Sequence, residues 1–257
     1  MNRDHPIIDV HAHWGPWFFA MDIGSAAENI RLMDEYGITI QLVSASEGVV
    51  YDAPGGNANL APVLEANPRL RGYLVVNPNN PEAGEADLRR HLGSGLWSGV
   101  KIHTGYPLRT IDSPQMAETF AMLDSFGVTL LIHTWGPDVL VLPKLLETNR
   151  NMRVVAGHMG ADRWDLAAEA ARSCDRLYLE PSCSLTESMR MRHVLDHTPP
   201  GQILFGTDAT LIDPAVAFGL LEDADPAPEL AERIYWKNAA DLFGLHDQLE
   251  SLAGGRK

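Results

Sequence analysis

The sequence predicts a single α/β domain, a (β/α)8 TIM barrel spanning residues 1–257. Three observations support this prediction. The length of 257 residues is close to the ~250 typical of an eightfold barrel. Short runs rich in Val, Ile and Leu alternate with longer amphipathic stretches, as in βα units around a parallel sheet. The runs start roughly 20 to 35 residues apart, which is enough for one strand, one helix and two loops.

The expected strands are almost continuously apolar, so both faces of their sheet should be covered. We expect them at residues 7–13, 38–46, 71–77, 99–103, 128–134, 152–158, 176–182 and 202–208. A closed barrel and an open doubly wound sheet both meet that requirement. The positions of the polar residues distinguish the two architectures.

Helix signals lie between these runs. Ser25 and Gly37 flank one amphipathic stretch, and Ser113 and Gly127 flank another. Serine caps the amides at a helix start, and glycine allows the left-handed exit at its end. Pro143 should cut or kink one of the later helices. These are expected over residues 138–148, 162–173, 186–197 and about 228–245.

Composition narrows the class of protein. Hydrophobic residues make up 45% and charged residues 21%, which is typical of a folded globular chain. The net charge of −14 argues against nucleic acid or membrane surfaces as partners and favours a small-molecule substrate. We expect no membrane span, because no apolar run approaches ~20 residues. The two cysteines, Cys174 and Cys183, lack C-x-x-C spacing, and no signal peptide is evident, so we expect a cytoplasmic protein.

Polar residues collect at the C-terminal ends of the expected strands. The set comprises His11, His13, Lys101, His103, His133, His158, Glu180 and Asp208. In a barrel these ends converge on one rim, so residues of the first and eighth strands become neighbours. In an open sheet those two strands would usually lie far apart. The distribution therefore favours the closed barrel.

Two of the histidine motifs are weak when taken alone. His11 and His13 lie two residues apart on a strand, so both side chains project from one face and can reach one ion. A single His-x-His also arises by chance or at a solvated strand edge. His133 closes an apolar strand and, in isolation, is more typical of a core histidine bonded to a backbone carbonyl.

The other two motifs are also ambiguous alone. His158 lies between Gly157 and Gly160 at a turn, where the backbone can bend to expose the imidazole, although plain turn structure explains it equally well. Asp208 ends an apolar strand, where a carboxylate is costly to bury unless it is paired or bound to a cation, but it could instead cap a helix. Three neutral imidazoles and one carboxylate suit zinc and leave a position for water. Their shared rim predicts a metal site.

As a set, these motifs resemble the amidohydrolase superfamily, and more narrowly its amidohydrolase-related (amidohydrolase 2) branch. That branch includes lactone hydrolases and enzymes similar to aminocarboxymuconate-semialdehyde decarboxylase. The resemblance rests on the His-x-His, on the histidines ending the fifth and sixth strands, and on the Gly-Thr-Asp at residues 206–208. Residues 157–160 and the closing stretch 237–245 also resemble the branch, and the likeness spans residues 7–245.

The resemblance implies that His11, His13, His133 and Asp208 ligate one divalent metal, usually zinc. It also implies that His158 lies beside the metal and orients or polarises water or substrate, and that Asp208 shuttles a proton. General chemistry agrees with these roles. A metal lowers the pKa of bound water, and a neighbouring carboxylate and imidazole can take and return the proton.

Lys101 has three interpretations. It resembles the lysine that is carboxylated and bridges two metals in binuclear members of the superfamily. In the amidohydrolase-related branch, which generally uses one metal, a lysine here can instead contact an anionic substrate. In the third interpretation its head snorkels to the rim without a role. His103 lies two residues further on the same face and can help to shape the pocket.

Weaker candidates lie in the loops. Arg109 and Arg163 follow the fourth and sixth strands, and either could grip a substrate carboxylate, although surface charge is the commoner role. Glu180 is expected to orient a ligand rather than bind the metal. The loop after the first strand is rich in aromatic residues, which suggests a pocket wall or a subunit contact: Trp14, Trp17, Phe18 and Phe19.

The sequence therefore predicts a metal-dependent hydrolase in which activated water attacks a small, carboxylate-bearing lactone, ester or amide. The alternative is a metal-dependent, non-oxidative decarboxylase of an aromatic or enoic acid. A catalytically silent metal-binding or partner-binding barrel is a third hypothesis, and the intact ligand set argues against it. By analogy with the branch, a homo-oligomer is a further expectation.

Overall fold

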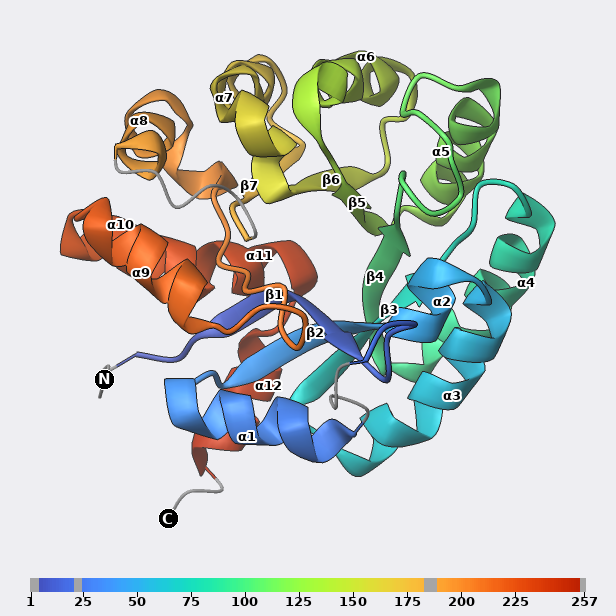
Figure 1. Ribbon diagram of the computed structural model, residues 1–257, viewed down its shortest axis with the longest axis horizontal. Coiled ribbons are helices and arrows are strands. Elements are labelled where there is room, and N and C mark those ends of the chain that lie inside the picture. The colour runs from blue at the N-terminus through green and yellow to red at the C-terminus, as the bar shows by residue number, and fades with distance from the viewer. Residues whose placement is uncertain (1–4, 21–24, 183–188, 255–257) are drawn as a thin grey trace.

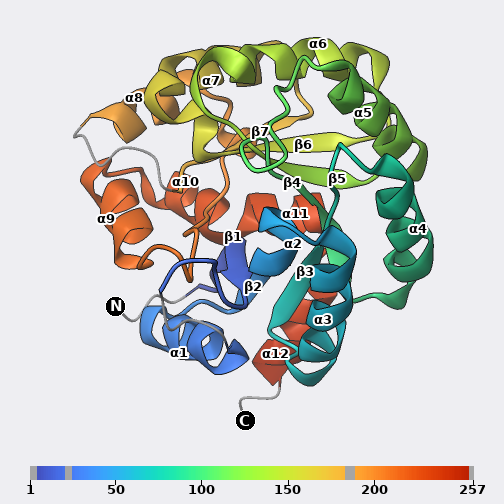
Figure 2. The same cartoon turned by 45° about the vertical axis from the view of Figure 1, so that its right-hand side comes forward.

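Seven parallel strands form one sheet in the computed structural model, which describes residues 5–20, 25–182 and 189–254. Each strand pairs with its neighbours in sequence, from β1 to β7. They are β1 (Ile8–Trp14), β2 (Ile40–Ala45), β3 (Leu70–Val75), β4 (Trp97–Ile102), β5 (Thr129–His133), β6 (Arg153–Gly157) and β7 (Leu177–Glu180). Figures 1 and 2 show these strands at the centre of the molecule, surrounded by helices. The first seven predicted strands are confirmed.

The helices follow the strands around the outside of the sheet (Figure 1). They are α1 (Ala26–Tyr36), α2 (Ser46–Val50), α3 (Ala53–Ala66), α4 (Pro81–His91), α5 (Pro114–Phe126), α6 (Val141–Thr148), α7 (Trp164–Ser173), α8 (Arg190–His197), α9 (Ala215–Asp223), α10 (Pro228–Glu232), α11 (Asn238–Phe243) and α12 (His246–Gly254). Short 3-10 helices are η1 (Leu92–Ser94), η2 (Gly136–Leu140), η3 (His158–Arg163) and η4 (Pro200–Gln202), and η5 (Arg233–Lys237) is a π-helix. No helix of the described ranges is long and apolar enough to cross a bilayer.

The predicted helix ends are largely confirmed. Gly37 and Gly127 both adopt the left-handed conformation after α1 and α5. The side chain of Ser113 caps α5, whereas Ser25 precedes α1 without a capping hydrogen bond. Pro143 lies in the first turn of α6, where a missing amide is tolerated, and the preceding residues form η2 instead of one continuous helix.

The predicted eighth strand at residues 202–208 does not form as a regular strand. Isolated parallel bridges instead join this part of the chain to both edges of the sheet. Ala209 bridges to Ala12 of β1, and Ile203 bridges to Leu179 of β7. Backbone hydrogen bonds from this segment to both edge strands accompany the bridges. The segment therefore lies between the first and last strands, in the position predicted for the eighth strand.

Local backbone conformation explains why this segment is not a strand. Asp208 has a φ of 59°, which lies in the left-handed region and is incompatible with an extended ladder. At Gly206 a Cβ atom would stand only 2.4 Å from Oε1 of Glu180, so only glycine fits against that side chain. The segment bends where it delivers Asp208 to the end of the sheet.

A β-bulge in β1 helps to orient the site. Between the pairs Asp9–Gln41 and Ala12–Val43, β1 has two residues where β2 has one. As a result, Val10 packs in an apolar cluster with strand residues such as Leu42 and Tyr73, together with residues of α11 and α12. The next residue, His11, still reaches Lys101 of β4. Bulges re-aim side chains in this way next to functional sites.

A buried carboxylate joins β1 to the segment at 203–209. Asp9 accepts hydrogen bonds from the hydroxyl of Thr207 at 2.6 Å, from its amide at 3.0 Å, and from the side chain of Gln41 at 2.9 Å. Asn29 of α1 donates to Gln41 in turn, at 2.9 Å. Burial raises the pKa of Asp9 to about 6, although these hydrogen bonds oppose the shift. Side-chain hydrogen bonds thus join β1 to the segment at 203–209, along a seam that lacks a regular ladder of backbone hydrogen bonds.

Thr207→Val removes the hydroxyl that Asp9 accepts while keeping the shape of the side chain. A buried hydrogen bond to a charged group contributes about 1.5–3 kcal/mol, so we expect the free energy of unfolding to fall by about 2 kcal/mol in urea denaturation. Thr119→Val is a matched control, because Thr119 is equally buried but donates only to the backbone carbonyl of Gln115. The control should lose about 1 kcal/mol or less. Equal losses would contradict the role of the seam.

Candidate metal centre

His11 and His13 end β1 with both rings buried. Nδ1 of His11 lies 2.5 Å from Oε2 of Glu180, and Nδ1 of His13 lies 3.1 Å from the hydroxyl of Ser44. These partners engage one nitrogen of each ring and leave Nε2 of each to face the site. A partner of this kind fixes the orientation and tautomer of a metal-binding histidine.

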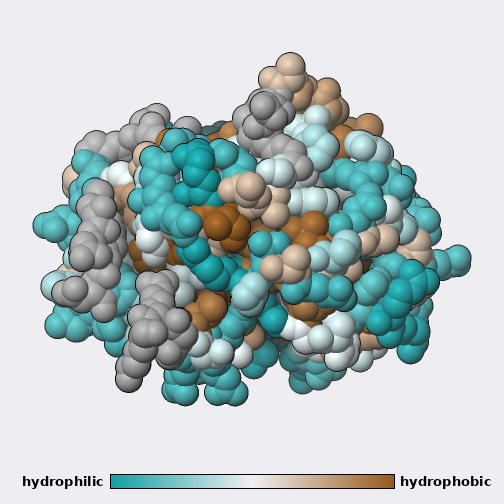
Figure 3. Space-filling view, turned by 90° about the horizontal axis from the view of Figure 1, so that it is seen from below, coloured by the Kyte–Doolittle hydropathy of each residue, from teal (hydrophilic) through white to brown (hydrophobic). Residues whose placement is uncertain are grey.

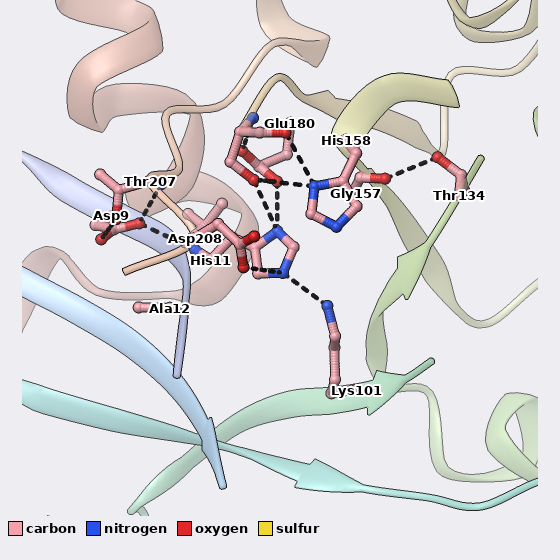
Figure 4. Close-up of polar contacts among 12 residues, drawn as sticks. Asp9, His11, Ala12, Lys101, Thr134, Gly157, His158, Glu180, Thr207 and Asp208 are labelled. Carbon is pink, nitrogen blue, oxygen red and sulfur yellow. Dashed lines mark hydrogen bonds and ion pairs between the residues drawn. The ribbon is translucent and has the colours of Figure 1, made fainter. Parts of the chain in front are cut away.

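Asp208 brings a carboxylate to the same two rings. Its Oδ1 lies 3.0 Å from Nε2 of His13 and 3.7 Å from Nε2 of His11. The amide of Asp208 donates to the carbonyl of His11 at 2.7 Å, which holds the two residues together. Donor atoms of the three side chains lie within 4.8 Å of one another, so one metal ion could contact all three. Figure 4 shows the carboxylate of Asp208 beside the ring of His11.

His133 lies close to the site through other rings. Its ring stacks on His103 with centroids 4.0 Å apart and lies edge-to-face with His158 at 4.7 Å. Within the described ranges, the close group around Asp208 contains His11 and His13, and His133 is outside it. The structure therefore brings together three of the four predicted ligands at ligand spacing and places the fourth beside them.

His158 is held in a left-handed turn after β6, with a φ of 64°. Its Nδ1 lies 2.9 Å from the carbonyl of Ser182, which can only accept, so the neutral ring carries its proton on Nδ1 and presents an unprotonated Nε2. Thr134 supports the turn, because its hydroxyl donates to Gly157 at 2.7 Å and accepts from the amide of Gly160 at 2.9 Å. The ring of His158 lies 4.8 Å from that of His11 (Figure 4).

Lys101 reaches the centre of the site. Its side chain is only 1% exposed, and Nζ lies 2.7 Å from Nε2 of His11 (Figure 4). The side chain of Lys101 is therefore buried among the site histidines, and its role stays a prediction. Burial lowers the pKa of Lys101 to about 8, and the charges of Asp208 and Glu180 oppose that shift. No other lysine or arginine of the described residues is buried.

Burial also sets the charge of the other groups. It lowers the pKa of every histidine at the site: His11, His13, His103, His133 and His158. Neutral imidazole is the form that binds metals. Burial raises the pKa of the Asp208 carboxyl, but the hydrogen bond from His13 and nearby positive charge outweigh it and lower that pKa overall. Burial raises the pKa of Glu180 to about 8, against hydrogen bonds from Ser182.

The predicted loop residues are less closely tied to the site. Nε of Arg109 donates to the side chain of Asn79 at 2.6 Å, and Arg163 pairs with Asp165 at 3.1 Å. In the described parts of the chain neither arginine has a hydrogen bond or ion pair with the site histidines or Asp208. Trp14 is half-buried and packs against the larger apolar core. Cys174 is a free thiol, and Cys183 lies outside the described residues.

Three polar residues of the site were not predicted from the sequence. Ser44, Thr134 and Ser182 each contact a site histidine or the turn that holds one. Ser182 is the most connected, since its hydroxyl lies 2.8 Å from Glu180 and 3.2 Å from Nδ1 of His11. Their position at the C-terminal ends of β2, β5 and β7 was the available signal.

The chain matches a family model and several solved structures. The amidohydrolase family model matches residues 8–245. No curated protein sequence matches the chain. A 5-carboxyvanillate decarboxylase from Sphingomonas paucimobilis superposes with a TM-score of 0.74 at 16% identity, covering 93% of this chain and 99% of the other.

Two further similar structures hold bound ligands. A dihydroxybenzoic acid decarboxylase from Polaromonas sp. JS666, with bound manganese and the inhibitor 2-nitroresorcinol, has a TM-score of 0.76 and 17% identity, covering 95% of this chain and 99% of its own. A probable 2-pyrone-4,6-dicarboxylic acid hydrolase from Acinetobacter baumannii, with citric acid bound, has a TM-score of 0.71 and 17% identity, covering 93% and 99%. At these identities the structural likeness establishes the shared fold alone.

The buried neutral ring of His158 makes stability depend on pH. Its pKa is about 4 instead of 6.5, so between these values the unfolded chain binds a proton that the folded chain does not. The contribution of His158 to stability is therefore lost as pH falls from 6.5 towards 4, by up to about 1.4 kcal/mol per pH unit. In urea denaturation of metal-free protein, the free energy of unfolding of His158→Asn should rise relative to that of the wild type as pH falls from 6.5 to 4.5. A stability difference that is constant with pH would contradict this assignment.

Proposed function

Since this chain belongs to the amidohydrolase family, we propose that it is a metal-dependent hydrolase acting on a small, carboxylate-bearing lactone, ester or amide. In this proposal residues 1–257 form one domain, and the segment at 203–209 closes the sheet into a (β/α)8 barrel. One observation carries the proposal. The nitrogen donors of His11 and His13 and the carboxylate of Asp208 converge within 4.8 Å, although they come from opposite ends of the sequence.

The donor set fits a single divalent ion. We assign His11, His13, His133 and Asp208 as its ligands, and zinc suits this combination of imidazoles and carboxylate. The histidines are neutral and Asp208 is ionised at pH 7, as ligands must be. When bound, the metal would polarise a substrate carbonyl and lower the pKa of a water molecule.

The residues of the chain supply the proton transfers and the charge. Asp208, ionised and buried, can accept the proton of the attacking water and return it to the leaving group. His158 presents an unprotonated Nε2, which can orient the water or take up a proton. The ammonium of Lys101 can hold a substrate carboxylate or stabilise the oxyanion formed during attack.

The alternative is a non-oxidative decarboxylase of an aromatic or enoic acid on the same scaffold. The buried ammonium of Lys101 favours it, because a carboxylate at the centre of the site would find its counterion there. Two of the structural relatives are described as aromatic acid decarboxylases. In that reaction His158 or Asp208 would deliver a proton to the carbon that loses carbon dioxide.

The number of metals depends on the state of Lys101. Carboxylated at Nζ, this lysine would become an anion able to bridge a second metal, and His11 lies beside it. We propose the simpler form, in which Lys101 keeps its amine and the protein holds one metal.

Elemental analysis of the purified protein should find about one equivalent of divalent metal per chain. His11→Ala and Asp208→Asn should each lose it, because removing one ligand weakens a multidentate site by orders of magnitude. His246→Ala is the matched control, since that exposed histidine bonds only to Asp241 in the described structure. Wild-type protein that takes up no metal would refute the centre. Two equivalents, with a mass increase of one carbon dioxide on Lys101, would establish the binuclear alternative.

A panel of lactones, esters, amides and aromatic carboxylates should separate the two reactions. We expect release of acid without carbon dioxide, and a fall of at least about 10²–10⁴-fold in kcat for Asp208→Asn, which loses a metal ligand as well as the group for proton transfer. Both products are followed in the same assay, with the His246→Ala protein as control. Carbon dioxide release without hydrolysis would overturn the hydrolase in favour of the decarboxylase.

A further inference from the structure

Aromatic rings form a continuous path from one site histidine to another. Trp17 packs edge-on against His13 with centroids 4.9 Å apart, and Phe19 and Phe18 continue the path at 5.7 and 5.0 Å. Phe18 contacts Tyr106 at 6.1 Å, which joins the loop after β1 to the loop after β4. We call Trp17, Phe18, Phe19 and Tyr106 the aromatic arch.

The path returns to the site from the far end of the arch. Tyr106 lies on His103 with centroids 4.5 Å apart, and His103 stacks on His133 at 4.0 Å. Trp135 then lies parallel to His133, with centroids 5.8 Å apart and an interplanar angle of 7°. Its side chain is 52% exposed, so it offers a flat apolar surface next to the candidate ligand His133.

Exposed apolar side chains concentrate around this end of the barrel. The large exposed hydrophobic residues of the described ranges are Phe18, Phe19, Tyr51, Tyr106, Leu108, Trp135, Leu140 and Met189. All of them lie in connections that follow the C-terminal end of a strand. Figure 3 shows one face of the molecule, on which hydrophilic residues predominate and hydrophobic patches lie between them. A concentration of exposed apolar residues marks a binding surface.

Positive charge is scarce at the same end. The connections that follow the strands contain two basic residues, Arg109 and Arg163. Arg163 pairs with Asp165, whereas Arg109 donates from Nε to the neutral side chain of Asn79. Residues 21–24 and 183–188, whose structure is not described, contain no lysine or arginine in their sequence. At the start of α8, Arg190 lies over the ring of Trp164. Among the described residues, Lys101 is the one buried lysine or arginine, and its contact with His11 places it to meet an anionic group at the site.

We propose that the aromatic arch and Trp135 are specificity-determining residues that select a ligand with a flat apolar body and a single anionic group. The anionic group would meet Lys101 and the metal centre, so this inference rests on the proposed function. The apolar body would lie against Trp135 and the arch, where ring stacking and loss of exposed apolar surface favour it. A second carboxylate on that body would lose hydration against aromatic rings, and the described residues offer it no second buried lysine or arginine. Dicarboxylates should therefore bind more weakly.

The test compares two probes that differ by one carboxylate. Binding of 1-naphthoate and of naphthalene-1,4-dicarboxylate to the metal-loaded protein is measured by calorimetry. We expect 1-naphthoate to bind at least tenfold more tightly. In the double variant Phe18→Ala/Tyr106→Ala its affinity should fall about tenfold or more, because ring contacts of this kind are lost at two positions. Both side chains are exposed, so the fold should tolerate their removal.

Tyr51→Ala is the matched control, because Tyr51 is an exposed aromatic residue near the same end with no ring contact to the arch in the described structure. It should leave the affinity unchanged. Equal binding of the two probes, or an equal loss in the control and the double variant, would overturn the inference. So would a change of oligomeric state in the double variant without a change in affinity, which would make the arch a subunit contact.

Metal content is measured on the same samples, which separates this inference from the proposed function. Protein without metal that still prefers 1-naphthoate and still depends on the arch would refute the metal centre and leave the specificity intact. Metal-loaded protein that binds the two probes equally would refute the specificity and leave the metal centre intact.

Discussion

The seam between β1 and the segment at 203–209 is the constraint on which the site depends. His11 comes from one side of the seam and Asp208 from the other, and the carbonyl of His11 accepts the amide of Asp208 at 2.7 Å. Asp9 reinforces this contact by holding Thr207 with its carboxylate. Because the candidate metal ligands lie within two residues of these hydrogen bonds, their spacing follows directly from the pairing of the first and last segments.

Pairing between neighbouring side chains explains how so many ionisable groups can be buried together at the site. Burial favours neutral histidines, which removes positive charge that would otherwise repel Lys101. Lys101 and Asp208 carry opposite charges, and each lowers the cost of burying the other. Glu180 has hydrogen bonds from Ser182 and a close contact with His11. Burial in this region is therefore sustained by pairing, which holds the side chains in one arrangement.

Local patterns predicted most of the fold. The seven strands and the glycine-terminated helices α1 and α5 follow from periodicity and capping, which depend on neighbours in sequence. The irregular eighth segment could not be predicted in the same way. Its glycine at 206 is required by Glu180, and its left-handed Asp208 is held by His11, and both contacts join residues far apart in the chain. The apolar pattern at 202–208 indicates only that the segment is buried.

The residues of the site divide in the same way, into those that sequence patterns predicted and those whose position depends on contacts between distant residues. Placing His11, His13 and Asp208 together required only the convergence of strand ends, which a barrel dictates. The position of the Lys101 head could not be predicted, because its flexible side chain could reach solvent or the interior. In the structure the head lies in the interior beside His11, where the charges of Asp208 and Glu180 partly offset the effect of burial on the pKa of Lys101. Ser44 and Ser182 were missed because their position at strand ends is the only signal they give, and a short hydroxyl side chain does not stand out there until its histidine partner is known.

Strand ends and loops contribute different properties to this protein. In the proposed function the strand ends carry the groups for metal binding and proton transfer, and structures at 16–17% identity share the fold that brings such ends together. The loops vary more freely between relatives, because few contacts of the core constrain them. Here the loops after β1, β4 and β5 supply several rings and a single basic residue, Arg109, and a ring accepts a flat apolar surface but gives no counterion to a carboxylate. Substrate choice in this chain is therefore to be deduced from its own loops, even where the chemistry is shared with its family.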